Sequence, residues 1–165
     1  MPLPRFGADD LLMWRFARAA TERDIVDRPG GGIDPPAAWV DAITAVATDL
    51  RVLRYGRDID PDRLVWELAV TGADTVMIGW RPAAHGVGGF RVGEGTPVAA
   101  AFAVAAVAVA DIAQTELGGY EFVQWPSRGG RVLRACEVAG TPLWLDPRTQ
   151  RVIAPIGALR ADAIW

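Results

Sequence analysis

The feature that most constrains this chain is an uninterrupted run of thirteen apolar residues, 98–110, rich in Ala and ended by Asp111. A helix that crosses a membrane needs roughly twenty such residues, so the run is too short for one. Thr96-Pro97 before the run and Gly118-Gly119 after it are typical helix boundaries. The sequence therefore predicts a long helix over residues 98–117, buried inside a soluble domain, and no membrane partner.

Three further helices are predicted from apolar spacing and from the residues that begin and end helices. The first covers residues 11–20, where Met13, Phe16, Ala17 and Ala20 repeat at helical spacing behind two Asp residues. The second follows Asp34-Pro35-Pro36 and places Trp39, Ile43, Val46 and Leu50 on one face. The third is a short helix between Asp60 and Gly72.

The remaining segments are rich in β-branched and aromatic residues and are separated by turn residues, which favours strands. The predicted strands cover residues 75–80, 90–92, 120–125, 131–138, 142–146 and 151–153. The last of these follow one another too closely for crossover helices, so their sheet should be antiparallel. We expect a single α+β domain over residues 1–165, with N-terminal helices and the long Ala-rich helix packed on a mainly antiparallel sheet.

Charge and residue usage exclude several classes of function. The net charge is -3 and all seventeen basic side chains are Arg, so the chain lacks the basic excess that drives nucleic-acid binding. Without Lys it can form neither a Schiff base nor a Lys-containing phosphate-binding loop. The chain has a single His and so offers few nitrogen ligands for a metal site, and we expect neither a metal nor another cofactor. Cys136 alone cannot form an internal disulfide, and residues 1–10 lack the apolar stretch of a secretory signal, which favours a cytoplasmic protein.

Two motifs could carry chemistry, and each has a simpler interpretation. Asp58, Asp60 and Asp62 alternate as at the start of a calcium loop, but Arg63 stands where that loop needs Gly, so helix capping is favoured. His85 lies in a Gly-rich segment between two predicted strands, where an imidazole can act as a general acid or base. Its surroundings contain no recognisable nucleophile motif, so we assign no catalytic residue.

Arginine and tryptophan occur together near the ends of predicted strands, and both residue types are enriched where proteins contact one another. Arg also stacks on Trp and matches carboxylate geometry. The predicted recognition surface consists of Trp80, Arg81, Trp125, Arg128, Arg131 and Arg134.

Two short segments resemble small bacterial toxin-immunity proteins. The helix, Gly-Gly stop and strand over residues 110–122 resemble a segment of several such proteins, and the turn over residues 145–152 is similar to turns in immunity proteins of the SMI1/KNR4 type. The resemblance implies a non-enzymatic protein that covers the active site of a toxin, and it assigns no functional residue.

The sequence thus predicts a non-enzymatic protein-protein interaction module. The resemblance to immunity proteins makes a toxin one candidate partner. Two alternatives stay open. One is a small hydrolase-like enzyme that uses His85. The other is a structural subunit of a larger assembly, for which the solution mass and the exposure of Ile164 and Trp165 are informative.

Overall fold

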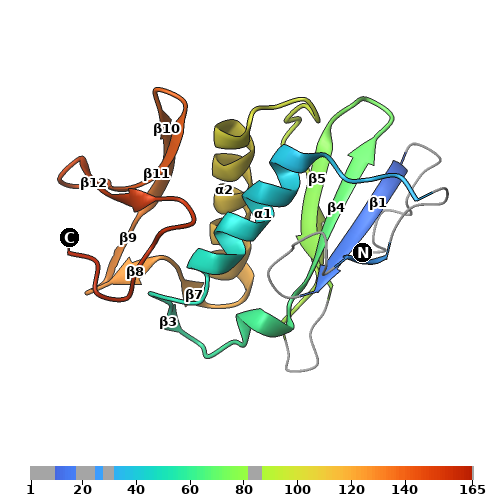
Figure 1. Cartoon of the computed structure of the whole chain (residues 1–165). Coiled ribbons are helices and arrows are strands. Elements are labelled where there is room, and N and C mark those ends of the chain that lie inside the picture. Colours follow the sequence, from blue (N-terminus) through green and yellow to red (C-terminus); the bar gives the residue numbers. More distant parts are fainter. Residues whose placement is uncertain (1–9, 18–24, 28–31, 82–86, 165) are drawn as a thin grey trace.

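The computed structural model describes residues 10–17, 25–27, 32–81 and 87–164 and shows an α+β fold with two sheets on either side of a helix (Figure 1). A five-stranded antiparallel sheet, in the order β2-β1-β4-β5-β6, contains β1 (Asp10–Ala17), β2 (Ile25–Asp27), β4 (Val65–Thr71), β5 (Val76–Trp80) and β6 (Phe90–Val92). A three-stranded antiparallel sheet contains β10 (Arg134–Val138), β11 (Thr141–Asp146) and β12 (Arg151–Pro155). Two short pairs complete the strands: β3 (Tyr55–Gly56) with β7 (Val123–Gln124), and β8 (Ser127–Arg128) with β9 (Arg131–Val132).

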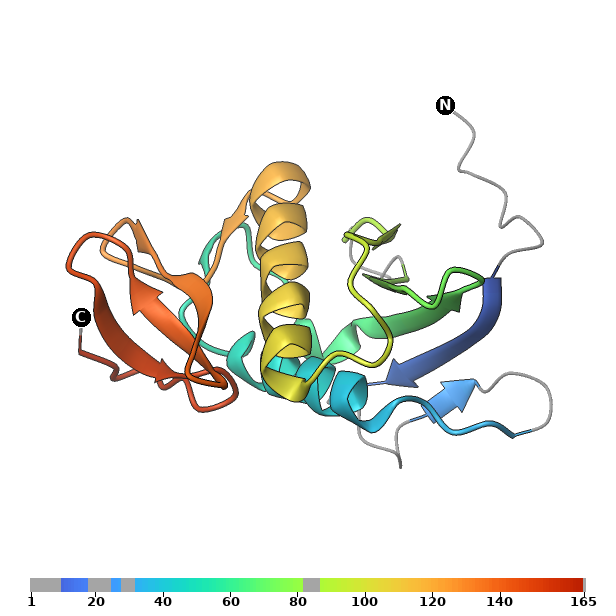
Figure 2. The same ribbon diagram turned by 90° about the horizontal axis from the view of Figure 1, so that it is seen from above.

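Helix α2 (Phe102–Tyr120) stands between the two sheets, and α1 (Ala37–Asp49) packs against it (Figure 2). The predicted long helix is therefore confirmed, and its Ala side chains allow close approach of α1, β10 and β11. By length and apolar composition alone, α2 is the one helix in the described part of the chain that could cross a membrane. Its packing against the neighbouring elements gives its apolar composition a second explanation.

The α2 helix starts four residues later than the sequence predicts, because Val98 is held by other parts of the chain. The Val98 amide donates to the Asp74 carbonyl at 2.9 Å, and the Val98 carbonyl accepts from the Trp39 indole at 3.0 Å. With both backbone groups engaged elsewhere, this residue cannot begin the helical ladder.

The predicted helix over residues 11–20 is wrong in its described part, because residues 10–17 form strand β1. The same residues also alternate: Trp14 and Phe16 are buried toward the core, while the half-buried Arg15 points to the other face. Strand β1 pairs with β4 along its length, which satisfies the hydrogen-bonding groups of its backbone. In this pairing the side chains of β1 alternate between the two faces of the sheet, with a period of two residues instead of the helical period.

The predicted helix between Asp60 and Gly72 is also wrong. The Asp60 carboxylate accepts the Asp62 amide at 3.1 Å and caps only one turn of 3-10 helix, Pro61–Arg63. The rest is strand β4, which is buried on both faces, and such strands lack the alternation that distinguishes strand from helix. The N-terminal helices of the predicted architecture are thus reduced to α1, and capping by Asp60 is confirmed.

The other predicted elements are confirmed with small shifts. Helix α1 lies where the Pro-capped second helix is predicted, and β5, β6, β10, β11 and β12 coincide with predicted strands. The strand expected at residues 120–125 shrinks to β7, because α2 continues through Gly118 and Gly119 to Tyr120.

A buried carboxylate joins α1 to the C-terminal segment. Asp49 is fully buried, and it accepts hydrogen bonds from the Trp144 indole (2.6 Å) and from the amides of Gly157 (2.7 Å) and Leu159 (2.9 Å). Burial raises the pKa of Asp49, and the three donors act against that rise. These bonds fix the three-stranded sheet and the chain after it relative to the helices.

Candidate interaction surface

The two tryptophans of the predicted recognition surface are buried, with about 1% of each side chain exposed. Trp80 donates its indole N–H to the Gly88 carbonyl at 3.1 Å and packs edge-on against Trp66 and Phe90. Trp125 donates to the Asp49 carbonyl at 3.1 Å. Both side chains serve the core, so neither can contact a partner in this fold.

The four predicted arginines do not form one cluster. Arg81 is exposed just after β5, in the five-stranded sheet region, whereas the other three lie in the C-terminal part of the chain. Arg128 binds the Ala163 carbonyl, and Arg131 pairs with Asp146 at 3.1 Å. Arg134 is exposed at the start of β10. Binding of a partner by these arginines stays a prediction.

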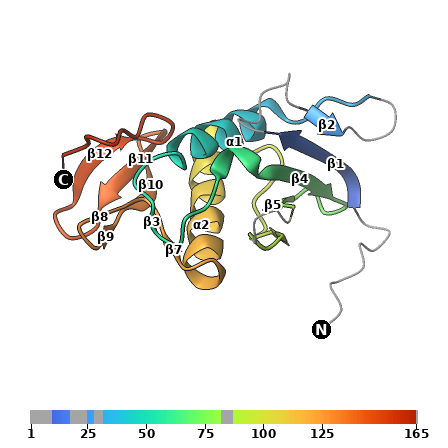
Figure 3. The ribbon, with the colours of Figure 1, turned by 90° about the horizontal axis from the view of Figure 1, so that it is seen from below.

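The C-terminal end of α2 lies beside the pair of strands β3 and β7 (Figure 3), and these elements or their neighbouring residues carry the most exposed aromatic side chains in the described part of the chain. Tyr55 is 67% exposed, Tyr120 70% and Phe122 77%. Tyr55 begins β3, Tyr120 ends α2, and Phe122 directly precedes β7. We call these three residues the aromatic end.

An ion pair lies between the segments that carry the aromatic end. Glu121, between Tyr120 and Phe122 in the chain, is only 7% exposed and pairs with the exposed Arg57. Its second carboxylate oxygen accepts the Gly88 amide at 2.7 Å, and its carbonyl accepts Arg57 Nε at 3.2 Å. These contacts tie α2, the segment after β3 and the segment before β6 together, so the aromatic side chains project from a fixed backbone.

The close pairing of β3 and β7 requires glycine at position 56. Gly56 has φ +116°, and a Cβ there would lie 2.2 Å from the Phe122 carbonyl oxygen. The same carbonyl accepts the Arg57 amide at 3.2 Å. Tyr55 is consequently held beside the chain that carries Phe122.

Three residues at this end of α2 depart from the residue preferences of a helix end. Phe122 follows the C-cap residue Glu121 and has φ +56°. This is a left-handed conformation, and the residue that adopts it at the end of a helix is usually Gly. Gly118 and Gly119 lie inside the last turn, where Gly is less favourable than Ala, although a Cβ at either position would meet open space. Departures from local preference without compensating contacts are expected at functional sites.

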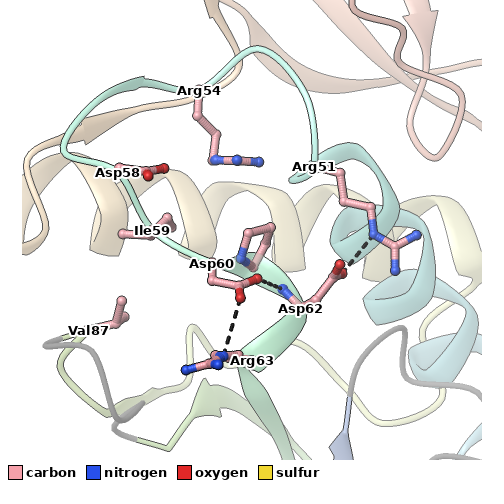
Figure 4. A pocket seen from close by; sticks show the side chains of 9 residues that line it. Arg51, Arg54, Asp58, Ile59, Asp60, Asp62, Arg63 and Val87 are labelled. Atoms are coloured by element: carbon pink, nitrogen blue, oxygen red, sulfur yellow. Dashed lines mark hydrogen bonds and ion pairs between the residues drawn. The ribbon is translucent and has the colours of Figure 1, made fainter.

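A cleft of about 570 Å³ is lined by residues of the segment between α1 and β4 and by Val87 (Figure 4). Its charged groups are mostly paired: Arg51 with Asp62 at 2.9 Å, and Arg63 with Asp60 at 3.4 Å. The lining residues are Arg51, Arg54, Asp58, Ile59, Asp60, Pro61, Asp62, Arg63 and Val87. This lining offers charged groups of both signs, and the lining residues include no His, Cys, Ser, Thr or Lys.

His85, the centre of the enzymatic alternative, lies outside the described residues, as does Trp165. Within the described ranges, no group of three or more His, Cys, Asp or Glu side chains is placed to hold a metal ion. Comparisons with protein families, curated proteins and solved structures find no match to this chain.

Sequence reasoning missed the aromatic end because it placed Tyr120 and Phe122 inside a strand, where one face would be buried. The sequence holds no local signal for this end, because Gly118-Gly119 is a typical helix stop and α2 nevertheless continues to Tyr120.

Proposed function

We propose that this protein is a protein-protein interaction module that binds its partner through the aromatic end. The proposal is carried by Phe122, a large apolar side chain that is mostly exposed although its backbone adopts a conformation that glycine would hold at lower energy. A side chain that neither packs in the fold nor suits its backbone is explained if it packs against another molecule.

The composition of the surface supports a protein as partner. Tyr and Phe have large contact areas and few rotatable bonds, so ordering them on binding costs little entropy. Tyr55 and Tyr120 add hydroxyl groups that can satisfy polar atoms at the edge of a contact. Since Arg57 and Glu121 neutralise each other, the aromatic end itself favours an apolar pocket or groove on the partner rather than a strongly charged one.

Site-specific photocrosslinking in cells of the source organism tests this proposal. A photoreactive phenylalanine replaces Phe122 in one variant, and in the control variant it replaces Val104, which is 44% exposed on α2. We expect a protein that crosslinks from position 122 and not from position 104. Equal patterns from both positions, or no adduct at position 122, would contradict the proposal.

Toxin neutralisation is the narrower version of this proposal, and it rests on the short resemblance to immunity proteins. Under this version the protein crosslinked from position 122 has a toxic activity, and the purified chain suppresses that activity in proportion to binding. If the crosslinked protein has no such activity, the toxin version fails while the interaction module stands.

The enzymatic alternative has its own test in His85. If the chain is a hydrolase that uses this imidazole, any turnover of ester or phosphoester substrates must disappear in His85→Ala and persist in Phe122→Ala. The structural-subunit alternative predicts a solution mass above that of one chain, with Ile164, which is exposed, at a contact between subunits.

A further inference from the structure

The three-stranded sheet presents one face to the core and a second, outer face. Ala135, Trp144 and Ala154 pair across the strands and belong to the hydrophobic core. Because successive side chains of a strand point to opposite faces, Arg134 and Leu145, which pair with each other, point away from the core. The register of β11 and β12 shifts at this point, so that the exposed Val152 pairs with Leu145.

The outer face is mainly apolar. A second outward row pairs Cys136, Leu143 and Pro155. Val152 is about half exposed, and Leu145, although buried, does not belong to the main core cluster. Helix α2 contacts β10 and β11 and lies beside this sheet (Figure 2), and Trp144 belongs to the same core cluster as the buried residues of α2.

One end of this sheet is strongly basic. The antiparallel order brings Arg134 at the start of β10 and Arg151 at the start of β12 to the same end as Arg148 in the turn between β11 and β12. In the described part of the chain, none of these three forms an ion pair within 4 Å. Asp146 at this end is already occupied by Arg131 and by the amides of Arg148 and Thr149.

The charge is local to this part of the chain. Residues 125–165 contain six Arg and three acidic residues, whereas the whole chain has a net charge of -3. The nearby acid on α2 is Asp111, which interacts electrostatically with Arg134 and does not form an ion pair with it. The end of the sheet therefore keeps a positive potential beside an apolar face.

We propose that the outer face of β10–β12 is a second binding surface, separate from the aromatic end, for an acidic segment of a protein that alternates carboxylates with apolar side chains. Arg134, Arg148 and Arg151 would bind the carboxylates, whose geometry matches the forked guanidinium. The half-buried Leu143, with the exposed Val152 and Pro155, would receive the apolar side chains. These apolar residues favour a protein over a nucleic acid, since a phosphate backbone offers nothing to bury against them.

A direct binding measurement tests this second surface. The probe is a fluorescently labelled 12-residue peptide of alternating Glu and Val, titrated with the purified full chain at low and at high salt. We expect saturable binding that weakens with salt. Arg151→Glu should weaken it about tenfold, because it removes an attraction and adds a repulsion. A peptide of alternating Glu and Gly should also bind about tenfold more weakly, since burial of one Val is worth about that factor.

Two control variants separate the surfaces. Arg81→Glu makes the same change of charge on an exposed arginine away from this face and should leave the affinity within about twofold. Phe122→Gly should also leave the affinity for the Glu-Val peptide unchanged. The proposal of the second surface can therefore be refuted while that of the aromatic end stands, and the aromatic end can be refuted while the second surface stands.

Four results would overturn the proposal. The first is no saturable binding of the Glu-Val peptide. The second is equal weakening by Arg81→Glu and Arg151→Glu. The third is equal affinity for the Glu-Val and Glu-Gly peptides. The fourth is tighter binding of a labelled DNA duplex that Arg151→Glu abolishes, which would assign the face to nucleic acid.

Discussion

Replacing Phe122 by Gly should stabilise the protein while it removes the central side chain of the aromatic end. The left-handed conformation costs a residue with a Cβ roughly 1–2 kcal/mol, and Gly avoids this cost. Gly loses about 0.5–1 kcal/mol more conformational entropy on folding than other residues. Since Phe122 is 77% exposed, little burial is lost. The net expectation is a gain of about 0.5–1 kcal/mol, which in a chain of 165 residues raises Tm by about 1–4 °C.

The matched variant is Phe122→Ala, which removes the same ring but keeps a Cβ in the left-handed conformation. Urea unfolding of the wild type and both variants should rank Phe122→Gly as the most stable, with Phe122→Ala close to the wild type. A loss of more than about 1 kcal/mol in both variants would refute the reasoning, because it would show that the ring stabilises the fold itself.

Three further predictions concern the support of the two surfaces. Asp49→Ala should lower the free energy of unfolding by about 3–5 kcal/mol in urea titration, because it leaves three buried donors unpaired; a loss below about 1 kcal/mol would contradict this. Gly119→Ala should raise stability by up to about 1 kcal/mol with the helix content unchanged in circular dichroism, and a decrease would show that its Cβ meets something. Burial, with Glu94 nearby, raises the pKa of Asp111 to about 6, so the folded chain keeps a proton that the unfolded chain releases between pH 3.8 and about 6. Stability should therefore fall as pH rises through that window, and Asp111→Asn should be more stable than the wild type by about 1–2 kcal/mol at pH 7.5 but not below pH 4; parallel pH profiles would contradict this.

The elements that the sequence predicts well are those with a strong local signal. The Ala-rich run before Asp111 has one plausible structure in a small domain, and the prolines at positions 35 and 36 fix the start of α1. Hairpins β10–β11 and β11–β12 have turn residues at the correct spacing. The helix boundaries and hairpin turns depend on residues that are close together in the chain, so they can be predicted from the sequence.

The failures have a common physical cause. The segment of β1 fits a helical and a strand period equally, and only its pairing with β4, about fifty residues away, selects the strand. The aromatic end depends on the pairing of Tyr55 with Gln124 and on the backbone conformation of Phe122, both of which are tertiary features. The burial of Trp125 depends on a tertiary contact as well, since Asp49, whose carbonyl accepts the indole hydrogen bond, is far away in the sequence.

The most direct test of the central claim is a calorimetric titration of the protein crosslinked from position 122 with the wild type, Phe122→Gly and Gly119→Ala. Phe122→Gly should bind at least about 30-fold more weakly, as expected for a central contact residue worth about 2 kcal/mol, although it folds more stably. Gly119→Ala controls for the gain in stability and should retain more of the affinity than Phe122→Gly does. Undiminished binding by a correctly folded Phe122→Gly variant would contradict the claim that this chain binds its partner through the aromatic end.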